Sequence, residues 1–357
     1  MKIEKLKRMK VLIISPNPVF GGAATANMAI AEVLSNNHEV IYCDEYLDGK
    51  MIEKKTVNYI VDDYKIHGNK FNIGFKFFRY VKQINPDTII WGNYMVSIYY
   101  ILAIMYFGIF KKYKQCYIFH STALEKNFKG EAIDWIVSFL TIFMDRLIFV
   151  SNYTKNSWGT KFFVKLLKKE KHIVIHNPIM LNVNIDKNSK SDFCKISYVG
   201  RVSSEKQPDL FCEIAAGDSK IERKYYLWGD GPLENSIKAK YHGTVEFKGF
   251  ESNMTNIYFN TDILILTSKF ENCPMVILEA KKMGIPCIAP RVGGIPEIVS
   301  NTIDGELYDT FSIDYIHKMI DKIIKNYDSY SKSCLKNSQE YESLSTLKKW
   351  NKTLMFN

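Results

Sequence analysis

The chain has 357 residues, of which 46% are hydrophobic and 24% charged, a composition typical of soluble globular proteins. This length favours two domains, each large enough to bury its own core. The seven Cys residues include no CxxC pair, which argues against a disulfide framework and a structural zinc site and favours reduced thiols in a cytoplasmic protein. The formal net charge of +10 favours anionic partners, such as nucleic acid, anionic lipid or phosphorylated ligands.

The first half of the chain alternates short apolar runs with helical stretches. A helix is expected at 24–34, after a loop that holds Gly21 and Gly22. Buried strands are expected at 11–15, 39–43, 84–91, 116–120, 146–151 and 172–178. Short strands separated by helices indicate βαβ units and a parallel sheet.

Two segments of this half raise the question of membrane contact. Residues 89–110 carry no charge, but Gly92 and Asn93 divide the run, and the remaining piece at 94–110 is shorter than the roughly 20 residues that a bilayer span prefers. A buried or membrane-touching helix is therefore favoured over a span. Residues 161–171 mix Phe and Leu with Lys at roughly helical spacing. This pattern fits a helix on anionic lipid and equally a solvated helix packed on its own domain.

The strand and helix pattern restarts after a polar stretch at 182–195, which we interpret as a linker. We expect two doubly wound α/β domains, residues 1–181 and 182–341, with a C-terminal helix of about 342–357 that packs back on the first. Such sheets bind ligands at the carboxyl ends of their strands, so two facing domains predict a ligand cleft between them. Further strands are expected at 195–201, 225–231, 244–249, 262–268 and 286–290, and helices at 209–216 and 276–283.

The segment 268–299 carries the strongest chemical signal. A strand leads into a loop with Glu271, the loop reaches Pro274, and a helix that contains Glu279 follows. A helix N-terminus presents free backbone N–H groups and the positive end of a dipole, which suits a phosphate or sugar hydroxyls. With Glu279 about two turns into the helix, both carboxylates can face one ligand from different heights.

Candidate ligand groups also follow other strands. Arg201 and Lys206 come after the strand at 195–201, where two cations suit a diphosphate, although a pair of surface charges is the plainer interpretation. Gly21 and Gly22 permit close approach of the backbone to a phosphate, a weak signal by itself. His120 ends a strand, where a satisfied structural His and a ligand-facing His are both consistent with the sequence.

These motifs together resemble the GT-B family of retaining glycosyltransferases often called glycosyltransferase family four. The resemblance covers about residues 11–305. It rests on GGA at 21–23, His120, HNPI at 176–179, VGR…EK at 199–206, GDGP at 229–232 and the E-x7-E block ENCPMVILE at 271–279 with its G-x-P and GG-x-PE followers. The chain departs from the family pattern at Asn272, Cys273, Lys281, Lys282 and Ser121.

The resemblance implies a role for each of these residues. Glu271 would contact hydroxyls of the donor sugar and Glu279 would bind the ribose. Arg201 and Lys206 would neutralise the leaving diphosphate, so that no metal and no cofactor is needed. His120 would sit over the donor sugar. The other residues that the resemblance implies bind the nucleotide sugar are Gly21, Gly22, Asn272, Cys273, Pro274, Met275 and Val276.

The implied reaction is transfer of a hexose or N-acetylhexosamine, with retention, from a nucleoside diphosphate sugar to a saccharide or lipid-linked saccharide in surface polysaccharide synthesis such as O-antigen or capsule. A UDP-sugar is the favoured donor and GDP-mannose the alternative. We expect a cytoplasmic enzyme, peripheral on the inner face of the cell membrane if an anionic surface is its partner. The rival functions are a GT-B sugar-nucleotide epimerase and a basic nucleic-acid-binding protein, but no nucleic-acid motif supports the latter.

Overall fold

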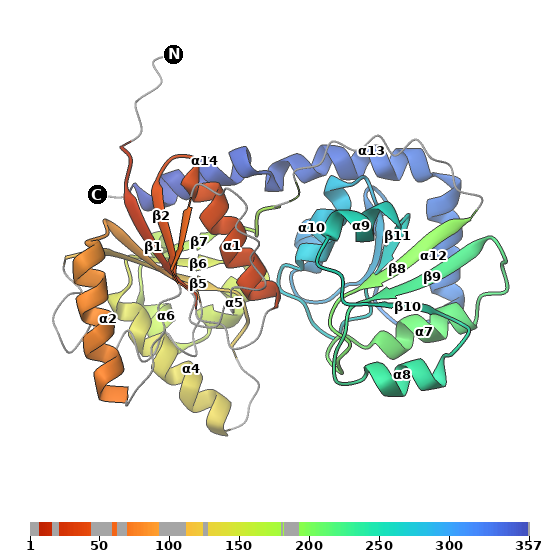
Figure 1. Ribbon diagram of the computed structural model, residues 1–357, viewed down its shortest axis with the longest axis horizontal. Coiled ribbons are helices and arrows are strands. Elements are labelled where there is room, and N and C mark those ends of the chain that lie inside the picture. The colour runs from red at the N-terminus through yellow and green to blue at the C-terminus, as the bar shows by residue number, and fades with distance from the viewer. Residues whose placement is uncertain are drawn as a thin grey trace, which may run out of the picture. The chain divides into compact units, whose positions relative to one another are not determined.

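The computed structural model describes residues 7–15, 21–43, 59–62, 70–92, 112–123, 128–179, 181 and 193–355. The chain forms two compact units: unit 1 is Met1–Pro178 together with Ser343–Asn357, and unit 2 is Ile179–Glu342. Each unit is a parallel β-sheet with helices on both of its faces (Figure 1). This arrangement confirms the prediction of two Rossmann-like doubly wound domains. The segment 94–110 and most of the expected linker lie outside the described residues.

The sheet of unit 1 has the strand order β3-β2-β1-β4-β5-β6-β7, with all neighbours parallel. Its central strands are apolar and buried on both sides, as expected for a parallel sheet covered by helices. The strand β3 adds to those predicted from the sequence. The strands are β1 (Lys10–Ile14), β2 (Glu39–Cys43), β3 (Tyr59–Asp62), β4 (Thr88–Trp91), β5 (Lys114–Phe119), β6 (Arg146–Phe149) and β7 (His172–Val174).

The basic segment 161–171 is not one continuous helix, so that prediction is wrong. Helix α6 ends at Leu166, because Leu167 and Lys168 have extended backbones with ψ angles of 147° and 136°. Only Val164 of this short helix is buried. The helices of unit 1 are α1 (Gly22–Ser35), α2 (Lys70–Ile84), α4 (Phe128–Leu140), η2 (Thr141–Phe143), α5 (Asn152–Gly159), α6 (Phe162–Leu166), η3 (Lys169–Lys171) and α14 (Ser343–Leu354).

The C-terminal helix α14 packs against α1 in unit 1. Its side of the contact is apolar, with Leu347, Trp350 and Leu354 buried. A polar link accompanies this packing, because the Nε2 atom of His38 lies 2.8 Å from Oδ1 of Asn351. Burial lowers the pKa of His38. The last helix therefore belongs to the N-terminal core although the chain first runs through all of unit 2.

The sheet of unit 2 has the strand order β10-β9-β8-β11-β12-β13, again with parallel neighbours. The strand β13 adds to the predicted set. The strands are β8 (Cys194–Val199), β9 (Arg223–Trp228), β10 (Glu246–Gly249), β11 (Ile263–Ile265), β12 (Cys287–Pro290) and β13 (Gly305–Tyr308), and the helices are α7 (Pro208–Ala216), α8 (Glu234–Lys240), α9 (Met254–Phe259), α10 (Met275–Lys282), α11 (Ile295–Ile298), α12 (Ile313–Lys325), α13 (Tyr327–Ser338) and η4 (Gln339–Tyr341).

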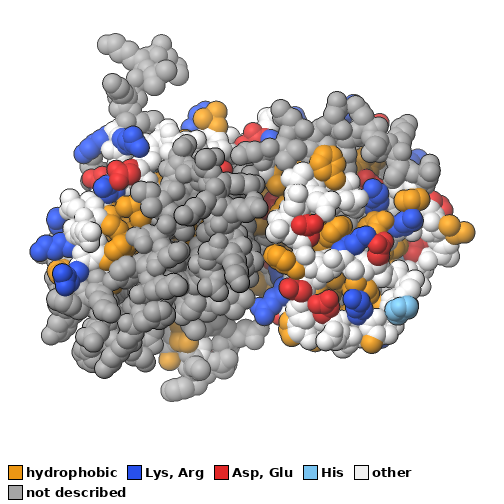
Figure 2. Space-filling model, in the orientation of Figure 1, with side chains coloured by type: hydrophobic (Ala, Val, Ile, Leu, Met, Phe, Trp, Pro, Cys, Tyr) orange, Lys and Arg blue, Asp and Glu red, His pale blue; other side chains and the backbone are white. Residues whose placement is uncertain are grey.

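The surface of unit 2 mixes charges of both signs: on the face turned to the viewer, Lys and Arg side chains are interspersed with Asp and Glu (Figure 2). All seven Cys side chains are free thiols, and all except Cys194 are buried. Within the described ranges, no helix is both long enough and apolar enough to cross a bilayer.

Candidate functional site

The loop after β8 carries both predicted cations and is held by the turn after β9. Gly229 and Gly231 have φ angles of +125° and +155°, and a Cβ atom on Gly229 would lie 2.0 Å from the carbonyl oxygen of Gly200. A Cβ on Gly231 would lie 2.5 Å from the carbonyl oxygen of Val202. The two loops meet this closely only because both positions are glycine. The GDGP motif therefore supports the backbone beside Arg201, whose side chain is exposed.

The same loop is tied to the end of β11. The hydroxyl of Thr267 donates to the carbonyl oxygens of Lys206 and Gln207 at 3.0 and 2.8 Å. The N–H of Lys269 donates to the carbonyl oxygen of Glu205 at 2.9 Å. Because β8 and β11 are neighbours in the sheet, these bonds place Lys206 next to the loop that contains Glu271.

Lys206 and Glu271 form a direct ion pair. Their Nζ and Oε1 atoms lie 2.5 Å apart, and the hydroxyl of Ser268 donates to the same Oε1 at 2.9 Å. The side chain of Glu271 is 11% exposed and that of Lys206 is 31% exposed. No described residue donates a hydrogen bond to the Oε2 atom of Glu271. The pair thus presents an ammonium group and a carboxylate oxygen at the carboxyl end of the unit 2 sheet.

The backbone of Glu271 depends on the glycine turn at 293–294. Gly293 has a φ angle of +57°, and a Cβ atom there would lie 1.8 Å from the carbonyl oxygen of Glu271. The N–H of Gly294 donates to this same oxygen at 2.9 Å. The GG-x-PE motif is evident in the sequence, but its support of the Glu271 loop was not predicted. The signal available in the sequence was the glycine pair itself, which permits positive φ.

Glu279 is buried inside unit 2 and interacts with a residue that sequence analysis missed. The hydroxyl of Tyr258, a wholly buried residue, donates to Oε2 of Glu279 at 2.8 Å. Burial raises the pKa of Glu279 to about 7, and the hydrogen bond from Tyr258 counteracts this shift in part. Helix α10 begins at Met275, so Glu279 lies about one turn from its start rather than the expected two.

The predicted backbone contacts cluster at the start of α10. Pro274 is the N-cap residue, and no side chain caps the helix. The first N–H groups of a helix lack partners within it. Asn272 and Val276 are half-buried, whereas Cys273, Pro274 and Met275 are buried. Two lysines depart from the family pattern later in this helix: Lys281 forms a buried ion pair with Asp304 at 2.8 Å, and Lys282 pairs with Glu342. Their contacts are therefore structural.

Gly21, Gly22 and His120 belong to unit 1. Gly21 is the N-cap of α1 with an extended backbone, and a Cβ on Gly22 would meet no atom within 4 Å. His120 directly follows β5 and is half-buried. Its Nε2 atom lies 2.7 Å from Oδ1 of Asn27, and burial lowers its pKa to about 4. His120 is thus neutral near pH 7 and is held by a buried amide that sequence analysis did not identify.

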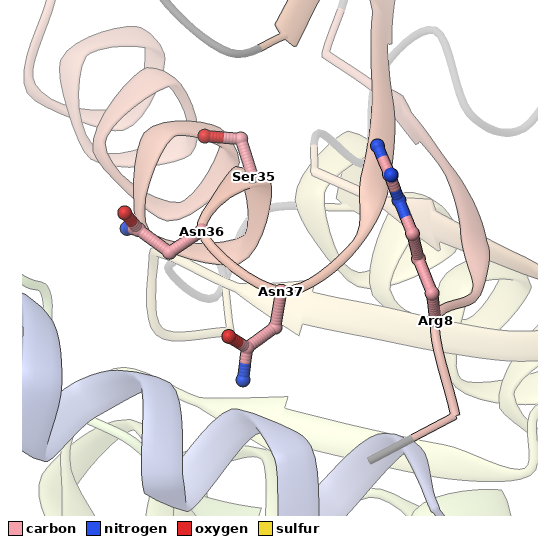
Figure 3. A pocket seen from close by; sticks show the side chains of 4 residues that line it. All are labelled: Arg8, Ser35, Asn36 and Asn37. Carbon is pink, nitrogen blue, oxygen red and sulfur yellow. The ribbon is translucent and has the colours of Figure 1, made fainter. Parts of the chain in front are cut away.

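A pocket of about 370 Å³ lies elsewhere in unit 1. Arg8 lies on one side of it, and Ser35, Asn36 and Asn37, at the C-terminal end of α1, lie on the other (Figure 3). None of the predicted site residues lines this pocket. The predicted residues instead divide between the two units: Lys206 and Glu271 lie in loops after strands of unit 2, Glu279 lies in its helix α10, and His120 follows a strand of unit 1.

The sequence is similar to a family of glycosyltransferases and to several of its curated members. The sequence profile of the Glycosyl transferases group 1 family matches residues 183–341. The chain is 27% identical over 245 residues to the UDP-Gal:alpha-D-GlcNAc-diphosphoundecaprenol alpha-1,3-galactosyltransferase of Escherichia coli, covering 60% of this chain and 62% of that protein. It is 31% identical over 146 residues to the N-acetyl-alpha-D-glucosaminyl L-malate synthase of Bacillus anthracis, covering 40% of this chain and 34% of that protein.

The matches span between 25% and 62% of the lengths of these two and three other curated relatives. Similarity of the fold extends over nearly the whole chain. The structure of Anabaena Alr3699/HepE in complex with UDP-glucose superposes with a TM-score of 0.79 at 16% identity, over 97% of this chain and 99% of that one. The C-terminal unit therefore matches the Glycosyl transferases group 1 family over residues 183–341, and the whole chain has the GT-B fold of two Rossmann-like units.

Proposed function

We propose that the chain is a retaining glycosyltransferase that moves a hexose or N-acetylhexosamine from a nucleoside diphosphate sugar to a saccharide or lipid-linked saccharide. The observation that carries the proposal is the Lys206–Glu271 pair at the strand ends of unit 2, inside the segment that matches the group 1 profile. One carboxylate oxygen accepts from Lys206 and Ser268, which leaves the other to accept from sugar hydroxyls.

The charges of this site suit a departing diphosphate. Lys206 carries a compact ammonium group, Arg201 in the same loop carries a planar exposed guanidinium, and the uncapped start of α10 adds the positive end of a helix dipole. Preorganised positive groups stabilise negative charge that develops on a leaving group. We propose that Arg201 and Lys206 do this work, with no metal ion, and that Glu279 binds the ribose.

The relatives guide the choice of substrates. The Escherichia coli relative is named for transfer from UDP-galactose to a diphosphoundecaprenol-linked sugar, and the Anabaena structure holds UDP-glucose. A further relative is named an O-antigen biosynthesis glycosyltransferase. We therefore propose a UDP-sugar as donor, ahead of GDP-mannose, and an acceptor in the synthesis of O-antigen, capsule or a similar surface polysaccharide.

A lipid-linked acceptor lies in a membrane, and unit 1 has an exposed apolar surface that suits membrane binding. We name it the α4–α6 surface. Trp135 is 58% exposed, Phe162 64% and Leu166 66%. Ring contacts join Trp135 to Phe163 at 5.4 Å, so helices α4 and α6 form one aromatic surface. The side chains of Lys165, Lys168 and Lys169 are exposed beside it. Apolar groups that enter the bilayer interface, together with lysines that meet anionic headgroups, bind such membranes.

The α4–α6 surface is tested by sedimentation with vesicles of phosphatidylglycerol and of phosphatidylcholine at low salt. We expect binding to the anionic vesicles alone and its loss in the double variant Phe162→Ser, Leu166→Ser. The control is Ile221→Ser in unit 2, which removes an apolar side chain that is 93% exposed. Equal binding by all three proteins would exclude this surface, and the absence of any binding would exclude the peripheral membrane location on the inner face of the cell membrane.

The donor is tested with a panel of UDP- and GDP-sugars. A true donor raises the melting temperature, because it binds only the folded state. Product analysis by NMR with a saccharide acceptor then reports whether the anomeric configuration is retained. Stabilisation by no member of the panel would contradict the proposed function. Conversion of the sugar without any acceptor would favour the epimerase.

A further inference from the structure

The strand ends of unit 1 carry a buried polar cluster. Ser15 follows β1, Gly92 follows β4 and His120 follows β5, and these three strands are adjacent in the sheet. The strand order reverses between β1 and β4, the point where sheets of this kind bind their ligands. Asn27 of helix α1 lies among these residues and is 0% exposed. Each hydrogen-bonding atom of its amide therefore requires a partner.

The orientation of the Asn27 amide follows from its partners. Its Nδ2 atom lies 2.9 Å from the carbonyl oxygen of Gly92 and 2.7 Å from the hydroxyl oxygen of Ser15. A backbone carbonyl only accepts hydrogen bonds, so the atom facing Gly92 must be the nitrogen. A flipped amide would place two acceptor oxygens against each other. Oδ1 of Asn27 consequently faces His120.

The orientation of this amide determines where the imidazole carries its proton. Oδ1 accepts only, so the Nε2 atom of His120 at 2.7 Å must donate. We infer that Asn27 is a positioning residue that holds His120 with a proton on Nε2 and leaves Nδ1 as a hydrogen-bond acceptor for a substrate hydroxyl. No described residue hydrogen bonds to Nδ1. The role toward substrate rests on the proposed glycosyltransferase function.

Two further observations support this arrangement. Burial lowers the pKa of His120 to about 4, so the ring is neutral at pH 7 and Nδ1 keeps its lone pair. Gly92 permits the contact that orients the amide, because a Cβ atom there would lie 2.5 Å from Nδ2 of Asn27. The glycine that interrupts the apolar run at 89–110 thereby acquires a specific role.

The first test observes the proton directly and needs no substrate. In protein with ¹⁵N-labelled histidine at pH 7, the His120 signals are assigned by their loss in His120→Gln. We expect a neutral ring with the proton on Nε2, and an N–H signal protected from exchange with water. In Asn27→Ala this protection is lost. A wild-type ring with its proton on Nδ1, or with two protons, would overturn the inference whether or not the chain is a transferase.

The second test is a double-mutant cycle on transfer of sugar from the donor found in the panel. We expect Asn27→Ala to lower kcat by about tenfold to a hundredfold with unchanged affinity for UDP, because a misplaced group loses catalysis without losing nucleotide contacts. In a His120→Gln background the same change should have little further effect. If the losses of kcat in the two single variants add in full in the double variant, Asn27 acts through the fold rather than through His120.

A third variant keeps the inference testable if Asn27→Ala does not fold. Ser15→Ala removes one acceptor of the Asn27 amide and leaves His120 and Gly92 in place. We expect faster exchange of the His120 N–H and a smaller loss of kcat than in Asn27→Ala. An unchanged exchange rate in a folded Ser15→Ala protein would contradict the network, and no detectable transfer by any protein would count against the proposed function alone.

Discussion

The two units hold their candidate site residues by different means. In unit 2, the Lys206–Glu271 pair is charged, partly exposed and supported by backbone contacts that only glycine allows. In unit 1, His120 is neutral and held by a buried amide. Charge of both signs suits a ligand with a diphosphate and hydroxyls, whereas a neutral ring suits an uncharged sugar. Unit 2 therefore positions its site residues through electrostatics and backbone shape, whereas unit 1 positions His120 through the direction of hydrogen bonds.

The largest expected effect tests the charge in unit 2. Glu271→Gln keeps the shape but removes the negative charge that pairs with Lys206, and we expect transfer to fall by about 10²- to 10³-fold. Steady-state kinetics measures the loss, and circular dichroism checks that the fold is intact. Transfer at the wild-type rate would refute the assignment of Glu271.

The backbone support of Glu271 is tested by Gly293→Ala. We expect a loss of stability of about 1–3 kcal/mol or more, because the methyl group would meet the carbonyl oxygen of Glu271 at 1.8 Å. The matched control is Gly243→Ala, at a φ angle of +82° with no atom within 4 Å of the added Cβ. The control carries only the backbone strain. If urea unfolding shows the same loss of stability in both variants, the contact with Glu271 does not contribute to stability.

The buried carboxyl of Glu279 predicts a pH dependence of stability. Its folded pKa of about 7 lies above its ordinary value of 4.5, so between these values the folded state binds a proton that the unfolded chain releases. The contribution of Glu279 to the free energy of unfolding is therefore fully present below pH 4.5, decreases by up to about 3 kcal/mol as the pH rises to about 7, and is lost above that pH. Glu279→Gln should remove this slope, as measured by urea unfolding from pH 4.5 to 8. Parallel pH profiles for both proteins would contradict the raised pKa.

The smallest expected effect concerns Ser268. Ser268→Ala removes a neutral hydrogen bond to Glu271 but leaves the ion pair with Lys206, so we expect a few-fold loss of transfer, equivalent to about 1 kcal/mol. The same kinetic assay measures it. A loss as large as that of Glu271→Gln would mean that the hydroxyl rather than the charge positions the carboxylate, and the contrast between the two units would weaken.

The sheets were largely predictable, because their central strands, such as β1, β4, β11 and β12, are local apolar runs that are buried on both faces. The predicted strands at 39–43 and 146–151 correspond to β2 and β6. The prediction of one helix over 161–171 was wrong. The residues have roughly helical spacing, but only Val164 of the short helix α6 is buried. The E-x7-E block identified Glu271 and Glu279, whereas Ser268 and Tyr258 were missed because nothing in their own neighbourhoods signals a distant partner.

Two α/β domains, the glycosyltransferase resemblance and the residue types of the site could be predicted from the sequence, because they depend on local periodicity and on a contiguous motif. The contact of Lys206 with Glu271, 65 positions apart, and that of Asn27 with His120, 93 positions apart, became apparent only in the folded structure. Both contacts arise where parallel strands bring distant loops to one edge of a sheet. The proton position on a His and the pKa of a carboxyl depend on such neighbours, which only the folded chain brings together.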